Sequence, residues 1–522
     1  MAVANAADST KKVGDPNAEY ESMRDIWQKC RAICSGERFA KALDTYLDIH
    51  GYSNLLIPFS PSMTDAQYKF YKAEAELPGI TAQFARMLVG GLLRKEPMLE
   101  LPDGMNEDIQ NWMMNNFTQD NSTITSFLDD ILWEEIQTGR AWIYVDYPVI
   151  PDVENATQEE IFDLAPFPVM WKAENIINWR VSPDEVGNAI LRQVIIKGSV
   201  ARYTDNEFHP EFIETVYVHE LDDTGHYQIR VFEKQSIEAK VPVVAGQKFV
   251  DNRKTTDNFV LVKTIQDIKA AGERLKLIPA WPLNGTISVS EPILSPIVDK
   301  EVSLYNKVSR RNHLLYGAST YTPIIKSDML DEDFDKIVDS GLGTWIKLGR
   351  DDDASVLETP TAALKDMDRA IAAAIEEMAK LGIRMLSPET AQSGVALELR
   401  NAAQNAQLGS LNNKVSVTIS KVIAFMIFWK TGDEIKDSDI GFQLSADFNP
   451  IPLGADWLRL ATEWYENGLI PRSIWLQILK QNDIMPPDYD DDDGLKEINN
   501  DEILLKKEKQ NEEFFDDVNT EA

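Results

Sequence analysis

The chain has 522 residues, and its 85 acidic against 52 basic residues give a formal net charge of -33 at pH 7. This charge argues against tight, sequence-independent DNA binding, because such binding comes from Lys and Arg neutralising phosphates. A hydrophobic content of 43% is enough for most of the chain to fold, and a chain of this length is expected to form about two to four domains.

Cysteine usage and hydropathy argue against a secreted or membrane protein. The two cysteines, Cys30 and Cys34, indicate no disulfide framework and suit a reducing compartment. The first residues, MAVANAADSTKK, lack the apolar core of a signal peptide. The longest uninterrupted apolar run, Val422–Trp429, is far shorter than a membrane span. We therefore expect a soluble protein that is made in a cytosol and has no membrane partner.

The first part of the chain is predicted to be mainly helical after a disordered start over residues 1–18, which are small and polar. Cys30 and Cys34 share one face of the first helix, and without further ligands nearby they are interpreted as buried thiols and not as a metal site. Gly90 and Gly91 are not followed by the Lys-Ser/Thr of a phosphate-binding loop, so a close contact between helices is predicted there. Apolar periodicity indicates these helices: Glu19–Gly36, Asp65–Leu77, Ile80–Arg94, Asn106–Phe117 and Ser122–Thr138.

The middle of the chain is predicted to be rich in strands. Asp222 to Gly225, with the sequence Asp-Asp-Thr-Gly, is a favourable hairpin turn. His209, His219 and His226 fall in this region, but their spacings of ten and seven residues match no compact metal-ligand motif. The expected strands are Trp142–Tyr147, the two ends of Val169–Arg180 around a short helix, Leu191–Ile196, Phe212–Glu220 and Tyr227–Glu233.

Two long amphipathic helices with a small β-rich insert between them predict a stalk with a tip. The helices are Glu291–Tyr316 and Thr361–Met385, each with apolar residues at spacings of three and four. Gly317 is expected to cap the first helix in a left-handed conformation, and Thr359 is expected to cap the start of the second. Three short runs form the insert: Tyr321–Lys326, Thr344–Leu348 and Ala354–Leu357.

The C-terminal part is predicted to be helical again. Leu386–Gly394 is rich in Pro, Gly and short polar residues and is interpreted as a loop. The tail from Pro486 is acidic, and its run Asp490–Asp493 is interpreted as solvated and disordered in preference to a cation site. Between the loop and the tail we expect helices over Val395–Gly409, Leu411–Lys430, Asp456–Asn467 and Arg472–Asn482 and a strand over Ile440–Phe448.

The sequence holds no convincing catalytic constellation. It contains no H-E-x-x-H, no P-loop and no nucleophile elbow, and five histidines leave few candidate general bases. Asp351 to Asp353 can be read as a nuclease metal cluster, but three consecutive acids on a strand cannot all point the same way, so an exposed turn is favoured. We expect no catalytic residue, no bound metal and no cofactor.

Several runs, in their order along the chain, resemble the portal proteins of tailed bacteriophages, and in particular a portal-like subgroup formerly of unknown function. The resemblance covers roughly residues 20 to 485. Each run is only moderately specific, and their common order is what makes the resemblance persuasive. The runs are TAQFARMLVGGLLRKEP, WEEIQTGRAWIYVDYP, KAENIINWR, IPAWPLNG followed by EPILSPIVDKEVSLYN, and LGIRMLSPETAQSGVALELR.

This resemblance implies an α+β, predominantly helical portal fold that assembles as a ring. Portals form a dodecamer at one capsid vertex, where the channel serves DNA packaging and ejection. The implied parts are a disordered start (1–18), a wing (19–290), two stem helices (291–316 and 361–385), a clip (317–360), a tunnel loop with more of the wing (386–455), a crown (456–485) and an acidic tail (486–522). The implied partners are further copies of the chain, the major capsid protein, scaffolding protein, the terminase large subunit, a head-tail adaptor protein and the double-stranded DNA in the channel. The protein would reside in the virion and, during assembly, in the host cytoplasm.

Three groups of residues are candidate sites under this resemblance. The tunnel loop would approach DNA through Ser387, Glu389, Thr390, Gln392 and Ser393, and the clip would dock partners through Lys326, Trp345, Lys347 and Arg350. The first stem helix has a basic group that either contacts capsid protein or DNA or is a solvated face compensating helix-end charge. That group is Lys300, Lys307, Arg310 and Arg311.

Two other functions stay open at this point. A minor capsid protein or head-tail adaptor is one, although adaptors are shorter and would not need a stem, a clip and a second stem. A nuclease that uses an aspartate cluster is the other. A closed ring additionally requires two different complementary surfaces on each copy, and an acidic channel would let a duplex slide because adhesion depends on phosphate neutralisation.

Overall fold

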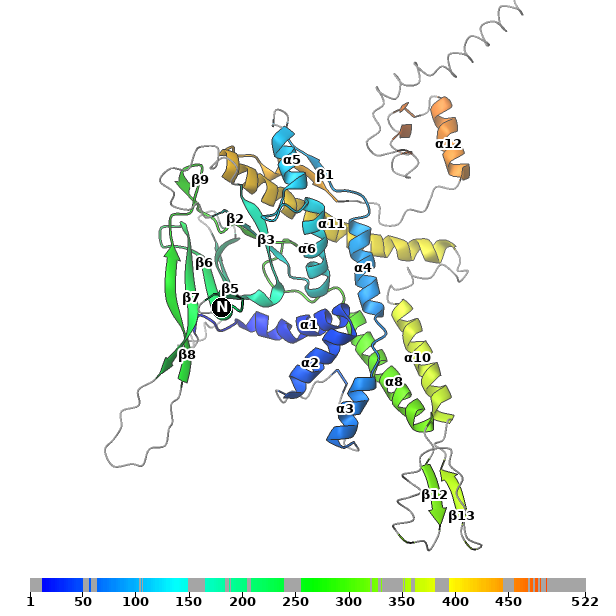
Figure 1. The fold of residues 1–522 in the computed structure, drawn as a ribbon. Coiled ribbons are helices and arrows are strands. Elements are labelled where there is room, and N and C mark those ends of the chain that lie inside the picture. The colour runs from blue at the N-terminus through cyan, green and yellow to red at the C-terminus, as the bar shows by residue number, and fades with distance from the viewer. Residues whose placement is uncertain are drawn as a thin grey trace, which may run out of the picture. The chain divides into compact units, whose positions relative to one another are not determined.

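The computed structural model describes most of the chain and divides it into two compact units, Met1–Ala446 and Asp447–Ala522. The first unit combines helices with antiparallel sheets (Figure 1), which confirms the α+β class. The described residues are 12–49, 56–57, 63–102, 105, 107–148, 165–183, 187, 189–203, 208–238, 255–319, 322–326, 330, 351, 353–357, 362–380, 394–444, 455–467, 470–472, 475–476, 479 and 485.

The described residues before position 139 are mainly helical. The first, α1, begins after Asn17, whose side chain accepts a hydrogen bond from the backbone N–H of Tyr20 at 2.8 Å. The second, α2, was not predicted, whereas the other five confirm predicted helices with slightly different ends. The helices are α1 (Ala18–Ser35), α2 (Glu37–Ile49), α3 (Asp65–Glu74), α4 (Ile80–Leu92), α5 (Glu107–Asn115) and α6 (Ile124–Thr138).

The core around α1 confirms the prediction of buried thiols. Trp27, Cys30 and Ile33 have no exposed surface, and Cys34 is 2% exposed. Burial raises the pKa of Cys30 to about 12, so this thiol is not reactive at neutral pH. Two apolar faces meet here, because α1 packs on the sheet residues Ile177, Ile195, Val216 and Val218.

Two sequence predictions near the N-terminus were wrong. Residues 12–17 belong to the predicted disordered start, yet Asn17 donates its N–H to the carbonyl of Ile177 at 3.0 Å and Lys12 bonds Asn258 at 2.6 Å. A Cβ added to Gly90 or Gly91 would meet no atom within 4 Å, so neither glycine marks a close helix contact. Residues 1–11 lie outside the described part of the chain.

A five-stranded antiparallel sheet is the largest β element. Its strands are neighbours in sequence order because each pair is joined by a reversal of the chain. The predicted hairpin turn is confirmed, since Asp222 accepts hydrogen bonds from the N–H groups of Thr224 and His226, and Gly225 has a φ of 79°. The strands are β4 (Ile176–Pro183), β5 (Ala189–Arg202), β6 (Glu211–Leu221), β7 (Tyr227–Glu238) and β8 (Thr255–Ile265).

Smaller sheets join distant segments of the first unit. A three-stranded sheet has the order β11-β2-β3, and β1 pairs with β14, so a segment beyond residue 440 returns to the N-terminal half. The bounds are β1 (Met98–Glu100), β2 (Trp142–Asp146), β3 (Phe167–Trp171), the 3-10 helix η1 (Ala173–Asn175), β9 (Lys269–Ala270), β10 (Glu273–Arg274), β11 (Ala280–Pro282), the 3-10 helix η3 (Asp437–Asp439) and β14 (Gly441–Gln443).

The expected order of helix, strands and helix is present after residue 290. Helix α8 (Ser295–Ser319) is followed by β12 (Thr322–Lys326), β13 (Asp353–Leu357) and α10 (Ala362–Lys380). The prediction that Gly317 caps the first helix was wrong, because α8 continues through it to Ser319. Thr359 and the run Thr344–Leu348 lie outside the described residues.

Helix α11 (Gly394–Thr431) is one helix of 38 residues, so the prediction of two helices separated near Gly409 was wrong. The buried stripe Val415, Ile419, Val422 and Met426 stabilises the helix by packing, which outweighs the cost of an interior glycine. Residues 409–431 are long and apolar enough to cross a membrane by composition, but 67% of the most apolar part of this segment is buried inside the fold, as in a core helix.

The second unit contains α12 (Ala455–Glu466), which confirms the predicted helix there. The ring of Tyr465 on this helix stacks on Trp475, with 5.0 Å between ring centroids. Most of the second predicted helix and the whole acidic tail lie outside the described residues.

Candidate assembly site

Helices α8 and α10 pack side by side as an antiparallel pair, called the helix pair below (Figure 1). Lys300 bonds Glu377 at 2.6 Å, and Arg311 bonds Asp368 at 2.6 Å. Residue numbers rise along α8 while they fall along α10, so these two ion pairs fix the antiparallel alignment. They also place the start of α10 at the level of the C-terminal half of α8.

The apolar stripe of α10 forms the contact with α8. Ala374 and Met378 are buried, and Leu364, Met367 and Ile371 are half-buried at spacings of three and four. Ile375 lies beside this stripe but remains 44% exposed. Within the described residues, the helix pair therefore buries one face of α10 and leaves its opposite face in solvent.

The four basic residues predicted as a candidate site have different surroundings. Lys300 and Arg311 are paired with acids on α10, which is neither of the two interpretations made from the sequence. Arg310 is exposed and close to Tyr71 of α3, whose pKa burial raises and Arg310 lowers in part. Lys307 is half-buried. The ion pairs are partly exposed, so each contributes at most about 1 kcal/mol.

Glu301 anchors α8 to the helical body and was not predicted from the sequence. Its side chain is fully buried and accepts the backbone N–H of Ile80 at 2.9 Å and of Thr81 at 2.6 Å. These are the first N–H groups of α4, whose N-cap residue Gly79 offers no side-chain acceptor. A carboxylate from a distant helix thus satisfies them and interacts favourably with the helix dipole. The available signal was a charged residue inside the apolar stripe between Val298 and Tyr305.

A second anchor holds the connection that leads into α8. Asn284 donates to Glu135 at 3.0 Å and to the carbonyl of Gly139 at 2.8 Å, and Arg140 donates to the carbonyl of Ile287 at 2.9 Å. Gly139 has a φ of 62°, and a Cβ there would lie 3.4 Å from the Cα of Pro292. The positive φ therefore favours glycine at this position, while a Cβ would make ordinary van der Waals contact with the connection.

Burial perturbs both charges of this anchor. Desolvation raises the pKa of Glu135 to about 7, although bonds from Ala141 and Asn284 favour its ionised form. Desolvation also lowers the pKa of Arg140 to about 10. The Arg140 guanidinium lies 3.9 Å from the ring centroid of Trp179, which partly compensates its burial by a cation–π interaction.

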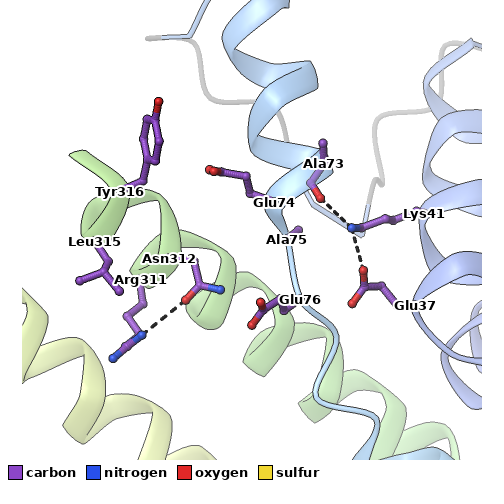
Figure 2. A pocket seen from close by; sticks show the side chains of 10 residues that line it. All are labelled: Glu37, Lys41, Ala73, Glu74, Ala75, Glu76, Arg311, Asn312, Leu315 and Tyr316. Atoms are coloured by element: carbon purple, nitrogen blue, oxygen red, sulfur yellow. Dashed lines mark hydrogen bonds and ion pairs between the residues drawn. The ribbon is translucent and has the colours of Figure 1, made fainter. Parts of the chain in front are cut away.

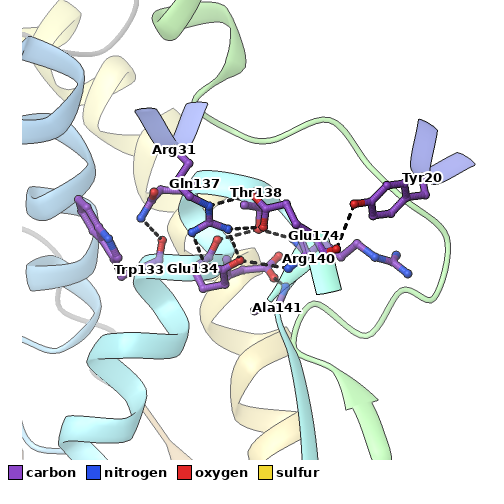
Figure 3. A network of polar contacts seen from close by, with 11 residues as sticks. Tyr20, Arg31, Trp133, Glu134, Gln137, Thr138, Arg140, Ala141 and Glu174 are labelled. Atoms are coloured by element: carbon purple, nitrogen blue, oxygen red, sulfur yellow. Dashed lines mark hydrogen bonds and ion pairs between the residues drawn. The ribbon is translucent and has the colours of Figure 1, made fainter. Parts of the chain in front are cut away.

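Arg31 joins α1 to α6 and η1 through two carboxylates (Figure 3). It donates to both oxygens of Glu134 at 2.8 and 2.7 Å and to both oxygens of Glu174 at 2.8 and 2.6 Å. Burial alone lowers the pKa of Arg31, but these bonds outweigh burial and raise it. Glu134 is 2% exposed, whereas the side chains of Arg31 and Glu174 are 28% and 24% exposed, so the network is a partly buried structural charge cluster.

A hollow of about 760 Å³ lies between α8, α2 and the segment after α3 (Figure 2). Lys41 bonds Glu37 at 2.8 Å and the carbonyl of Ala73 at 2.8 Å, so this cation is already used. The carboxylates of Glu74 and Glu76 make no ion pair among the described residues. The complete lining is Glu37, Lys41, Ala73, Glu74, Ala75, Glu76, Arg311, Asn312, Leu315 and Tyr316.

His219 and His226 have unrelated surroundings in the structure. His219 is enclosed, bonds the hydroxyl of Tyr227 at 2.6 Å, and has a pKa that burial lowers to about 3. His226 lies in the hairpin turn, where its Nδ1 is 2.8 Å from the hydroxyl of Thr224. Among the described residues no group of three His, Cys, Asp or Glu side chains is arranged to hold a metal ion.

Most residues of the other two predicted groups lie outside the described part of the chain. Lys326 is exposed at the end of β12, opposite Asp353 of β13. The undescribed residues are Trp345, Lys347 and Arg350 of the insert and Ser387, Glu389, Thr390, Gln392 and Ser393 of the loop. Their roles stay predictions.

Comparisons with known proteins give limited similarity. The model of a family described as a domain of unknown function (DUF4055) matches residues 293–430, which begin just before α8 and end within α11. No curated protein matches the chain.

The solved structures that are similar to the chain include three from gene transfer agent (GTA) particles. The neck of an empty particle computed with C6 symmetry gives a TM-score of 0.37 and 10% identity, and covers 76% of this chain and 89% of that one. The virion of a native particle gives 0.34 and 10%, covering 77% and 89%. The neck of a native particle computed with C12 symmetry gives 0.34 and 8%, covering 81% and 94%. TM-scores this low do not establish a shared fold.

Proposed function

We propose that this chain is a structural protein of a tailed-phage-like virion and, within that class, the portal subunit. Copies of it would form a ring at one capsid vertex. The ring would be the channel for DNA packaging and ejection, and it would dock the terminase and then a head-tail adaptor.

The observation that carries this proposal is the antiparallel helix pair with β12 and β13 between its two helices. The sequence resemblance leads us to expect two stem helices that bracket a small β-containing clip, and this order is what the chain has from α8 to α10. The bracketing ion pairs, Lys300 with Glu377 and Arg311 with Asp368, hold the two helices as one unit. A stem built in this way can carry a clip at a distance from the wing.

The anchoring of α8 supports the same assignment. Glu301 fixes α8 to the start of α4, and Asn306 donates to the carbonyl of Leu56 at 2.7 Å. These bonds and the anchor at Asn284 all involve the N-terminal half of α8 or the connection before it. Nearer the insert, Tyr316 and His313 of α8 contact Phe70 and Tyr71 of α3, and Arg311 pairs with Asp368 of α10. We therefore assign the wing to residues 19–290, the stem to residues 291–316 and 361–385, and the clip to residues 317–360.

The acidic composition suits a channel that DNA passes without adhering. A net charge of -33 on each copy makes the ring strongly negative, and duplex adhesion would require cations that neutralise phosphates. We place Ser387 and Glu389 near the DNA and Lys326 at the docking surface for terminase and adaptor. By the same assignment, residues 456–485 form the crown.

The test is electron microscopy of the purified protein, with subunits counted in class-averaged end views. We expect a closed ring with a central hole, and the resemblance gives twelve copies. A protein that remains monomeric over a wide concentration range would overturn the ring. Capsids made without this chain separate the portal from an adaptor, because loss of a portal leaves no DNA-filled heads, whereas heads lacking only an adaptor still fill.

A further inference from the structure

The outward face of α10 carries a basic and small-residue surface, called the α10 outer face below. Lys365, Arg369 and Ala372 follow one another at spacings of four and three, so they share the side of α10 opposite its contact with α8. All three are exposed, and among the described residues Arg369 makes one long ion pair, with Asp366 of the same helix at 3.5 Å. The acid Glu376 lies on this face two turns farther along, so the basic part is confined to the start of α10.

The hollow beside α8 has the opposite character. Its two cations are engaged, Lys41 by Glu37 and Arg311 by Asp368. Glu76 is exposed, and Oε2 of Glu74 is buried without a hydrogen-bond partner among the described residues. Figure 2 shows the side chain of Glu74 extending from the end of α3 toward α8. The hollow thus presents the exposed carboxylate of Glu76 and holds the half-buried Glu74, whose Oε2 has no hydrogen-bond partner among the described residues.

Apolar surface accompanies the charges at the hollow, where Leu315 and Tyr316 are 43% and 48% exposed. On the α10 outer face, the exposed Ala372 offers a small apolar side chain beside the basic ones. The two surfaces therefore combine unlike charge with some exposed apolar area, which is the composition of a subunit contact with a polar rim.

The two surfaces lie at the same level of the helix pair but on different sides of it. The bond between Arg311 and Asp368 puts the start of α10 level with residues 311–316 of α8, which line the hollow. In Figure 1, α10 lies on one side of α8 while α2 and α3 lie on the other. Rotating one copy about an axis parallel to the helix pair does not change the position of a residue along that axis. Such a rotation can therefore bring the α10 outer face of one copy to the hollow of the next.

We propose that the α10 outer face of one copy docks in the hollow of a neighbouring copy, with Lys365 and Arg369 pairing with Glu74 and Glu76. This contact is head-to-tail, since two different surfaces meet, and head-to-tail contacts close into rings. The inference rests on the proposed ring. It adds which surfaces meet in that ring and which charges determine the direction of assembly.

Charge swapping tests this contact. Lys365→Glu with Arg369→Glu would bring four negative side chains together at the contact. Glu74→Lys with Glu76→Lys would bring four positive side chains together there. Each pair of reversals should raise the protein concentration needed for half-maximal ring formation by about tenfold or more. Combining all four substitutions restores unlike charges and should bring ring formation back toward that of the wild type. Mass photometry across a dilution series measures this directly.

Matched controls separate the contact from general charge and folding effects. Lys263→Glu with Lys276→Glu changes net charge by the same amount at exposed positions outside both surfaces and should assemble as the wild type does. Glu76→Lys alone alters only an exposed residue, and thermal unfolding of each variant checks its fold. Rings that form normally in both single-sided variants, or a fourfold variant that assembles worse than either, would overturn the contact while leaving the ring intact. A wild-type chain that forms no ring would instead overturn the proposed function.

Discussion

Replacing Glu301 should loosen the contact between α8 and α4 more than any exposed substitution on α8. In Glu301→Ala, the N–H groups of Ile80 and Thr81 lose acceptors at 2.9 and 2.6 Å in a buried position. Loss of a helix cap costs about 0.5–2 kcal/mol, and hydrogen bonds to a charged acceptor are worth about 1.5–3 kcal/mol each. Because the alanine site also relaxes, we expect a net loss of about 2–4 kcal/mol in local stability.

Amide hydrogen exchange measures this loss at the site itself. If the first turn of α4 exchanges by local opening, a loss of about 2–4 kcal/mol corresponds to roughly 30- to 1,000-fold faster exchange. Glu301→Gln keeps one acceptor oxygen and should give an intermediate rate. Glu291→Gln, at an exposed position before α8, is the matched control and should leave exchange unchanged. Equal exchange in Glu301→Ala and the control would refute the cap that we assign to Glu301.

Three further predictions concern the buried charges and the glycine that anchor α8 and α1. Gly139→Ala should destabilise the protein by about 1 kcal/mol in thermal unfolding, because the φ of Gly139 is positive, and Gly285→Ala should cost about the same for the same reason. Unchanged stability in Gly139→Ala would contradict this explanation. Since burial raises the folded-state pKa of Glu135 to about 7 from an ordinary value of 4.5, the stability that its protonated form contributes is complete below about pH 4.5 and is lost as pH rises through 7, by about 3 kcal/mol in total. This fall in the free energy of unfolding between about pH 4.5 and 7 should be absent when Glu135→Gln is unfolded in urea. The same fall in the variant would contradict its attribution to Glu135. Arg31→Ala should lower the free energy of unfolding by about 3–5 kcal/mol, because it leaves Glu134 buried without its cation. Adding Glu134→Gln should recover part of that loss in the same unfolding assay. No recovery would mean that the loss comes from packing and not from charge.

Local sequence patterns were sufficient to locate most of the elements. Spacings of three and four gave α1, α3, α4, α5, α6, α8 and α10, and alternation with a hairpin turn gave the strands around Asp222. The order of helix, strands and helix from residue 291 onward could also be predicted from the sequence, because capping and periodicity depend on residues within a turn or two of one another. Element ends were less accurate, as at Gly317, where α8 continues past a residue that often ends helices.

Tertiary packing decided the cases in which a local signal was weak or misleading. Gly409 lies inside α11 because a buried apolar stripe stabilises that helix on the C-terminal side of the glycine. Gly90 faces open space and not a neighbouring helix. In both cases the same residue type has several uses, and only its neighbours in space select one of them.

The sequence by itself determined the acidic character of this protein, its buried cysteines and the helices that bracket the insert. It did not determine where the charges of the candidate assembly site go. Lys300 and Arg311 pair with acids on α10, and Glu301 caps a helix whose first residues are 220 and 221 positions away in the chain. The physical reason is that periodicity is a local property, whereas the partner of a charge depends on which surfaces folding brings together.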